Sequence, residues 1–107
     1  MAYDEELADR IRSLVAGEDG VTERKMFGGL AFLLNGNMAV AASGQGGILV
    51  RVDPEESARL VGTTPAEEMV MRGRSMAGWL RVDLAESELP EWVERGLSYA
   101  RSLPPKR

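Results

Sequence analysis

KMFGGLAFLLNGNMAVAASGQGGILVRV, residues 25–52, holds three apolar runs separated by turn-forming residues. The gaps contain Asn35-Gly36-Asn37 and the glycine-rich stretch 44–47, and Asn and Gly tolerate the positive φ that tight hairpin turns require. Gly28-Gly29 falls inside the first run, where we interpret it as a bend or bulge within one strand. The pattern predicts a three-stranded antiparallel meander. Its strands are expected at 25–34, 38–43 and 48–52.

Helical patterns flank this meander at both ends of the chain. Near the start, apolar residues recur at the spacing of one helical face, behind the acidic residues 4–6 that favour a helix N-terminus. These apolar residues are Leu7, Ile11, Leu14 and Val15. Near the end, Ser87 is expected to cap a helix whose first turn tolerates Pro90. The buried stripe of this last helix is expected to comprise Leu89, Trp92, Val93, Leu97 and Ala100.

The segment between the meander and the last helix predicts one more helix and two more strands. Asp53 is a good N-cap and Pro54 suits the first helical position, so a short helix is expected at 53–62. Strands are expected at 69–72 and 79–82. The order α-βββ-α-ββ-α predicts the α+β class: one two-layer domain over residues 1–107, with a five-stranded antiparallel sheet and helices on one face.

The composition excludes several kinds of chemistry. The 107 residues include no histidine and no cysteine, which removes the commonest general base, the commonest metal ligand and thiolate catalysis. We therefore expect no catalytic residue, no metal and no cofactor, and a protein that is not an enzyme. The acidic residues 4–6 are unlike a signal peptide, and no apolar run approaches the ~20 residues that span a bilayer, so a cytoplasmic protein without membrane contact is expected.

The alternation of side chains in two later strands predicts an interaction surface. Residues two apart in a strand share a face, so Leu49 and Arg51 lie opposite Ile48 and Val50, and Trp79 and Arg81 lie opposite Leu80. If the helices cover the Ile48 and Leu80 side, the other side combines apolar, aromatic and arginine residues, which are enriched at protein interfaces. The predicted surface comprises Met26, Phe27, Gly28, Gly29, Leu49, Arg51, Trp79 and Arg81. Its partner is expected to be a protein, and a homodimer is one form this contact could take.

Two alternatives stay open at this point. The middle of the chain is basic although the net charge is −4, and basic residues beside an aromatic ring could contact nucleic acid instead. This basic patch comprises Arg24, Lys25, Arg72 and Arg74, together with Arg51 and Arg81. The second alternative is a small-ligand site or an enzyme of unknown type at the Gly28-Gly29 bend, where the backbone is free to approach another group closely.

Three segments together resemble one known family. Residues 24–29, RKMFGG, are followed by 36–39, GNMA, and by 49–53, LVRVD. They resemble the N-terminal domain of the TfoX/Sxy family, and residues 76–82, MAGWLRV, resemble a later strand of its actinobacterial-type variant. The resemblance covers about residues 4–103 and implies a two-layer α+β fold of the YgaC/TfoX N-terminal type. It also implies a regulatory role related to the transcription regulators of natural competence, here in a stand-alone module.

Overall fold

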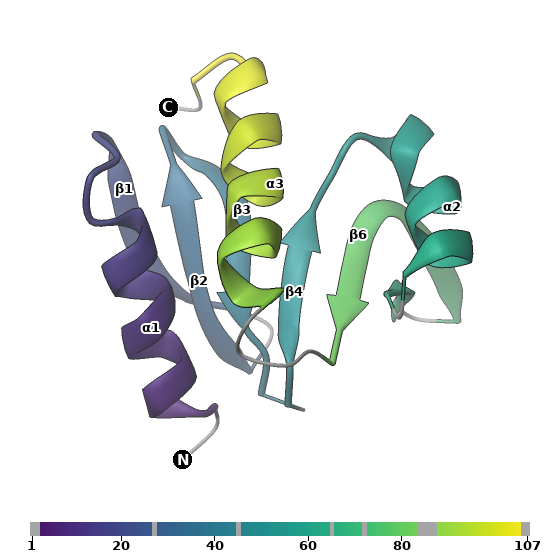
Figure 1. The fold of residues 1–107 in the computed structure, drawn as a ribbon, viewed down its shortest axis with the longest axis horizontal. Helices are drawn as coiled ribbons and strands as arrows, with labels where there is room; N and C mark the ends of the chain where they lie inside the picture. Colours follow the sequence, from purple (N-terminus) through teal and green to yellow (C-terminus); the bar gives the residue numbers. More distant parts are fainter. Residues whose placement is uncertain are drawn as a thin grey trace.

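A computed structural model describes residues 3–26, 28–44, 46–64, 66–71, 73–83 and 88–105. These residues form three helices and one antiparallel sheet of six strands in the order β1-β2-β3-β4-β6-β5 (Figure 1). The helices are α1 (Glu5–Val15), α2 (Pro54–Thr63) and α3 (Leu89–Ser102). The strands are β1 (Val21–Met26), β2 (Gly29–Leu34), β3 (Asn37–Ala42), β4 (Ile48–Arg51), β5 (Glu67–Met71) and β6 (Arg74–Val82). The predicted α+β class is confirmed.

The prediction of one bent strand over 25–34 is wrong, because the chain reverses there and forms the β1–β2 hairpin. Met26 pairs directly with Gly29, and Gly28 has a φ of +74°, a value that L side chains rarely adopt. A Cβ atom on Gly29 would collide with the carbonyl oxygen of Ala42, so this position also requires glycine. The sheet therefore has six strands rather than the expected five.

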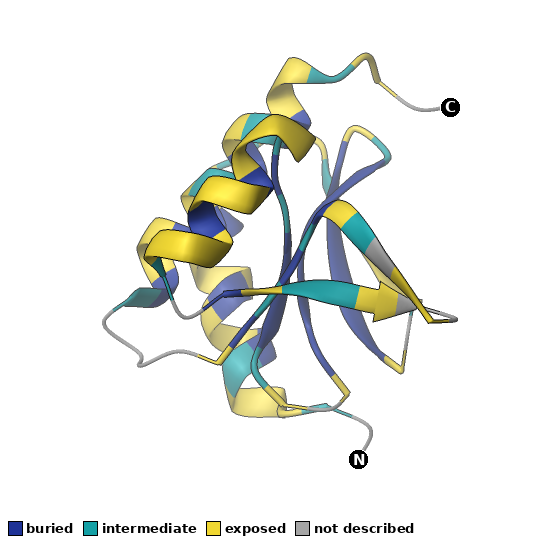
Figure 2. Ribbon diagram, turned by 90° about the vertical axis from the view of Figure 1, so that its right-hand side faces the viewer, coloured by how far each residue is buried: buried dark blue, intermediate teal, exposed yellow. Residues whose placement is uncertain are grey.

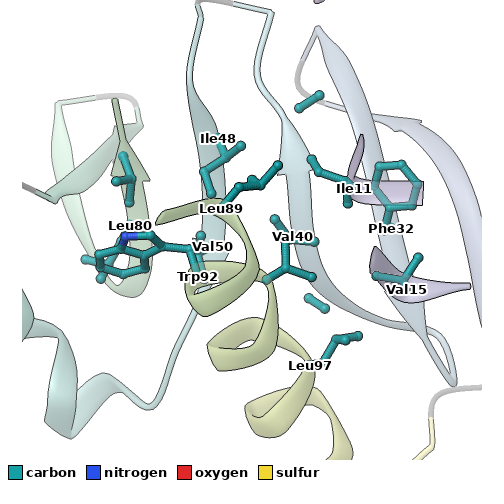
Figure 3. Packing of buried hydrophobic residues seen from close by; sticks show 14 of the residues in the cluster. Ile11, Val15, Phe32, Val40, Ile48, Val50, Leu80, Leu89, Trp92 and Leu97 are labelled. Carbon is teal, nitrogen blue, oxygen red and sulfur yellow. The ribbon is translucent and has the colours of Figure 1, made fainter. Parts of the chain in front are cut away.

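All three helices pack on one face of the sheet. That face carries the main core, in which Phe32, Ile48 and Leu80 are fully buried beneath α1, α2 and α3 (Figure 3). The expected stripe of α3 is confirmed, since all five of its predicted residues are buried. Gly96 brings this helix close to β3, because a Cβ there would collide with the carbonyl oxygen of Ala39. None of the helices in the described ranges is both long and apolar enough to cross a bilayer.

The predicted cap of α2 by Asp53 is confirmed, and α1 also begins behind an acidic side chain. The Asp4 carboxylate accepts hydrogen bonds from the backbone N–H groups of Glu6 (3.0 Å) and Leu7 (3.2 Å), and Asp53 accepts one from Glu55 (2.9 Å). The predicted face of the first helix needs one correction, because Leu14 is 41% exposed. Ser87, expected to cap α3, lies outside the described residues.

The β5–β6 hairpin departs from the two-layer plan. It starts beneath α2 on the helix side and runs to the opposite side of the sheet, where its end projects (Figure 2). The register shifts between Glu68 and Met69, and Gly78 with a φ of +86° lies in the corresponding part of β6. Bulges and glycines of this kind bend a strand and increase its twist. The bend brings Met69 against the sheet face that the helices leave uncovered.

Candidate interaction surface

The pairing of β4 with β6 places the four central residues of the predicted surface on one face. Leu49 lies opposite Arg81, and Arg51 lies opposite Trp79. Their neighbours Ile48, Val50, Leu80 and Val82 all belong to the core beneath the helices. The backbone therefore directs the side chains of Leu49, Arg51, Trp79 and Arg81 to the face opposite the helices, and the guanidinium group of Arg51, at the end of β4, also reaches Tyr99 of α3.

This second face carries its own apolar cluster, to which methionines contribute. Met26 from β1, Met69 from β5 and Trp79 from β6 are partly buried and pack against the centre of the face. The buried residues at the centre are Ala31, Leu33, Met38, Ala41 and Leu49. We call these eight residues the methionine face. It joins all six strands, and Met38, Met69 and Leu33 were missed by the sequence analysis because only the strand register brings them together.

The face is not an open apolar plane, which corrects one part of the prediction. Leu49 is only 5% exposed, and the alanines beside it, Ala31 and Ala41, are 0% and 1% exposed. Longer side chains, including those of Met26, Met69 and Trp79, pack against them. A partner would meet these side chains first and would reach Leu49 only after they moved. Of the remaining predicted surface residues, Gly29 is buried, Gly28 is exposed and Phe27 lies outside the described residues.

Arginines border the methionine face. A row of directly paired residues crosses the sheet from Arg24 through Ala31, Ala41 and Leu49 to Arg81. Arg51 lies two residues beyond Leu49 on β4, on the same face. We call Arg24, Arg51 and Arg81 the arginine rim. Strands are about 4.8 Å apart, so about 19 Å separate the two ends of the row.

Two aromatic rings hold Arg51 in place. Its guanidinium carbon lies 5.1 Å from the centre of the Trp79 ring and 5.7 Å from that of Tyr99 on α3. Both distances are within the range of a cation–π attraction. Among the described residues, no carboxylate forms an ion pair with Arg51. Its positive charge therefore stays available to an external carboxylate.

The structure separates the residues of the predicted basic patch. Arg24 and Lys25 are neighbours in β1, so they point to opposite faces, and Lys25 lies opposite Leu30 of the main core. Arg74 is exposed at the start of β6. Arg72 lies outside the described residues. The patch thus reduces to the arginine rim and to Arg74, which lies toward the end of the β5–β6 hairpin.

On the helix side, unlike at Arg51, arginines form ion pairs with carboxylates. Arg12 donates two hydrogen bonds to the Glu23 carboxylate, at 2.5 and 2.8 Å, and these bonds lower the pKa of Glu23. Arg101 does the same for Glu18, at 2.7 and 3.2 Å, and lowers its pKa. Further acids lie on the helices and at their first turns, at Asp4, Glu5, Glu6, Asp9, Glu55, Glu56, Glu91 and Glu94. Most acidic side chains thus lie on the helix side, where several of them pair with arginines of the helices.

A groove of about 540 Å³ separates α3 from the start of α2. Carboxylates and hydroxyls line it, with Val52 and Tyr99 as its apolar part. Glu91 forms an ion pair with Arg95 at 2.8 Å, and Glu56 one with Arg59 at 3.4 Å. No group of three potential metal ligands occurs within the described part of the chain. We see no arrangement here of a nucleophile, a base and an orienting group.

Comparison with known proteins gives one match. Residues 13–100 match the family model described as the TfoX N-terminal domain. No curated protein and no solved structure matches the chain.

Proposed function

The chain belongs to the TfoX N-terminal domain family, and from that premise we propose that it is a non-enzymatic regulatory or adaptor module that binds another protein through its methionine face. The observation that carries the proposal is the grouping of Met26, Met69 and Trp79 with the arginine rim on the sheet face opposite α1, α2 and α3. The family resemblance supports a role in transcription regulation related to competence, in the cytoplasm.

The chemistry of the face supports protein binding. Methionine has three rotatable bonds and a polarisable sulfur atom, so it adapts to the shape of a partner. Tryptophan and arginine are the residues most enriched among those that dominate binding energy. Trp79 would act as the apolar anchor, while the arginines would pair with carboxylates of the partner.

Nucleic-acid binding is the second candidate, supported by three arginines on one face. The methionine face argues against it, because its central row is apolar and Trp79 is already covered by Arg51. Proteins that bind single strands use free aromatic rings along a continuous basic groove. The net charge of −4 also disfavours attraction to phosphates.

The test compares variants on opposite sides of the domain. Arg24→Glu/Arg51→Glu reverses two arginines of the rim, and Arg59→Glu reverses one exposed arginine on α2. Affinity capture from cell extract, with identification of the bound proteins, is expected to recover a partner with wild type and Arg59→Glu but not with the double variant. Equal capture by all three proteins would contradict the proposal. Loss of bound DNA or RNA, rather than of a protein, would favour the second candidate.

A further inference from the structure

We infer that the partner presents an acidic amphipathic segment to the methionine face: a stripe of apolar side chains with carboxylates on both sides. This inference rests on the proposed function and adds the chemistry of the partner. It follows from the distribution of charge across the face, from its apolar centre and from the lack of a matching stripe among the described residues of the chain itself.

The charges on this face are nearly all positive. Arg24, Arg51 and Arg81 lie on this face, and the only acid on the same face in the described strands is Glu67, opposite Arg81. The net charge of the chain is −4, so this face and the helix side have opposite signs. A partner with negative charge is attracted to the face and repelled by the rest of the surface.

The positive charges lie at the margins rather than at the centre. Between Arg24 and Arg81, the row consists of Ala31, Ala41 and Leu49, all buried. Small residues lie here beneath the flexible side chains of Met26 and Met69, so displaced methionines would leave room for apolar side chains of a partner. The two ends of the row are about 19 Å apart, which is the length of about 13 helical residues.

A second copy of the chain offers no such segment among the described residues. Its large exposed hydrophobic residues are Leu14 on α1, Val61 on α2 and Val70 on β5. They lie on three separate elements and form no continuous stripe beside the acids. A different protein therefore fits the face better than self-association does.

The experiment selects binders without assuming their sequence. A displayed library of random 16-residue peptides is panned against the full chain, and the enriched peptides are sequenced. We expect apolar residues flanked by Asp or Glu, and binding that weakens as salt concentration rises. Affinity for a selected peptide should fall about tenfold or more in Arg24→Glu/Arg51→Glu and stay unchanged in Arg59→Glu.

Methyl NMR then locates the peptide. In protein labelled at methionine and isoleucine methyl groups, the signals of Met26 and Met69 should shift on peptide addition, while Ile11 in the main core should not. Peptides without acidic enrichment that still shift Met26 and Met69 would overturn the inference but leave the proposed function standing. Acidic peptides that leave both methionines unmoved would overturn both.

The remaining outcomes also decide the question. A library that yields only basic peptides, or no retained peptide, overturns the inference. If Met26 and Met69 shift on dilution of the protein alone, as its mass by light scattering falls from dimer to monomer, the face belongs to a second copy. If duplex DNA shifts the signals of Met26 and Met69, and the double variant no longer binds the DNA, the methionine face would be assigned to nucleic acid.

Discussion

Arg51 and Trp79 lie directly opposite each other on β4 and β6, with the guanidinium carbon 5.1 Å from the centre of the indole ring. Tyr99 of α3 approaches the same guanidinium group at 5.7 Å, so one side chain links the sheet face to a helix of the other layer. The contact restricts the conformations of both side chains. Among the described residues, no carboxylate pairs with the charge of Arg51.

Replacing the cation tests this link. Arg51→Met keeps much of the length of the side chain but removes its charge, and we expect the free energy of unfolding to fall by about 0.5–1 kcal/mol. Urea denaturation measures the change. Arg59→Met on α2, whose arginine forms an exposed ion pair with Glu56, is the control and should change stability by less. Equal effects of the two substitutions would argue against a stabilising role for the rings.

Two helical glycines should respond to the same substitution with opposite signs. Gly96→Ala places a methyl group against the backbone oxygen of Ala39, and overpacking of this kind costs about 1–3 kcal/mol. Gly62→Ala in α2 meets no atom within 4 Å and should stabilise the protein by up to about 1 kcal/mol. Thermal or urea unfolding of both variants checks the pair. A Gly96→Ala protein as stable as wild type would contradict the close packing of α3 on β3.

Acid should weaken the fold partly through Glu23. Its hydrogen bonds to Arg12 lower its pKa in the folded state, so its contribution is present above the pKa of the unfolded chain and is lost as pH falls through the folded value. The melting temperature of Glu23→Gln should therefore fall less steeply between about pH 6 and pH 3 than that of wild type. Asp19→Asn, at an exposed residue without an ion pair in the described structure, is the control. If the melting temperature of Glu23→Gln fell as steeply with pH as that of wild type, this result would contradict the contact between Arg12 and Glu23.

Burial on the methionine face should appear in the rates of methionine oxidation. Met38 is 4% exposed, whereas Met26, Met69 and Met76 are only partly buried, so dilute peroxide should oxidise Met38 last of these four. Peptide mass spectrometry at several reaction times measures the order. The same four residues should react alike in guanidinium chloride, which is the control. Early oxidation of Met38 in the native protein would show that the face is open.

Local patterns in the sequence predicted the elements with regular spacing. The stripe of α3 follows from its 3.6-residue period, and the turn at Asn35 and Gly36 follows from their tolerance of positive φ, observed at +52° and +84°. The β1 strand was missed because its middle is charged and exposed and it lies at a sheet edge, where no alternation of apolar residues is needed.

The interaction surface was predictable only in part. The alternation in β4 and β6 is local, and it placed Leu49, Arg51, Trp79 and Arg81 on one face. The contribution of Met38 depends on the register shift between β2 and β3, and that of Met69 depends on a sheet order that runs β4-β6-β5 and on the bend at Glu68 and Met69. Pairings between distant segments leave no mark in the local sequence. The separation of Lys25 from Arg24 was missed because the predicted strand began at residue 25; both residues lie in β1, where consecutive side chains point to opposite faces.

Site-specific photocrosslinking in cells tests the central claim most directly. Met26→benzoylphenylalanine places the reactive group on the methionine face, and Val61→benzoylphenylalanine places it at an exposed apolar position on α2. We predict a discrete crosslinked protein from position 26 that is absent from position 61 and is lost when Arg24→Glu/Arg51→Glu is added. Identical adducts from both positions, or a protein adduct from position 61 alone, would contradict the account.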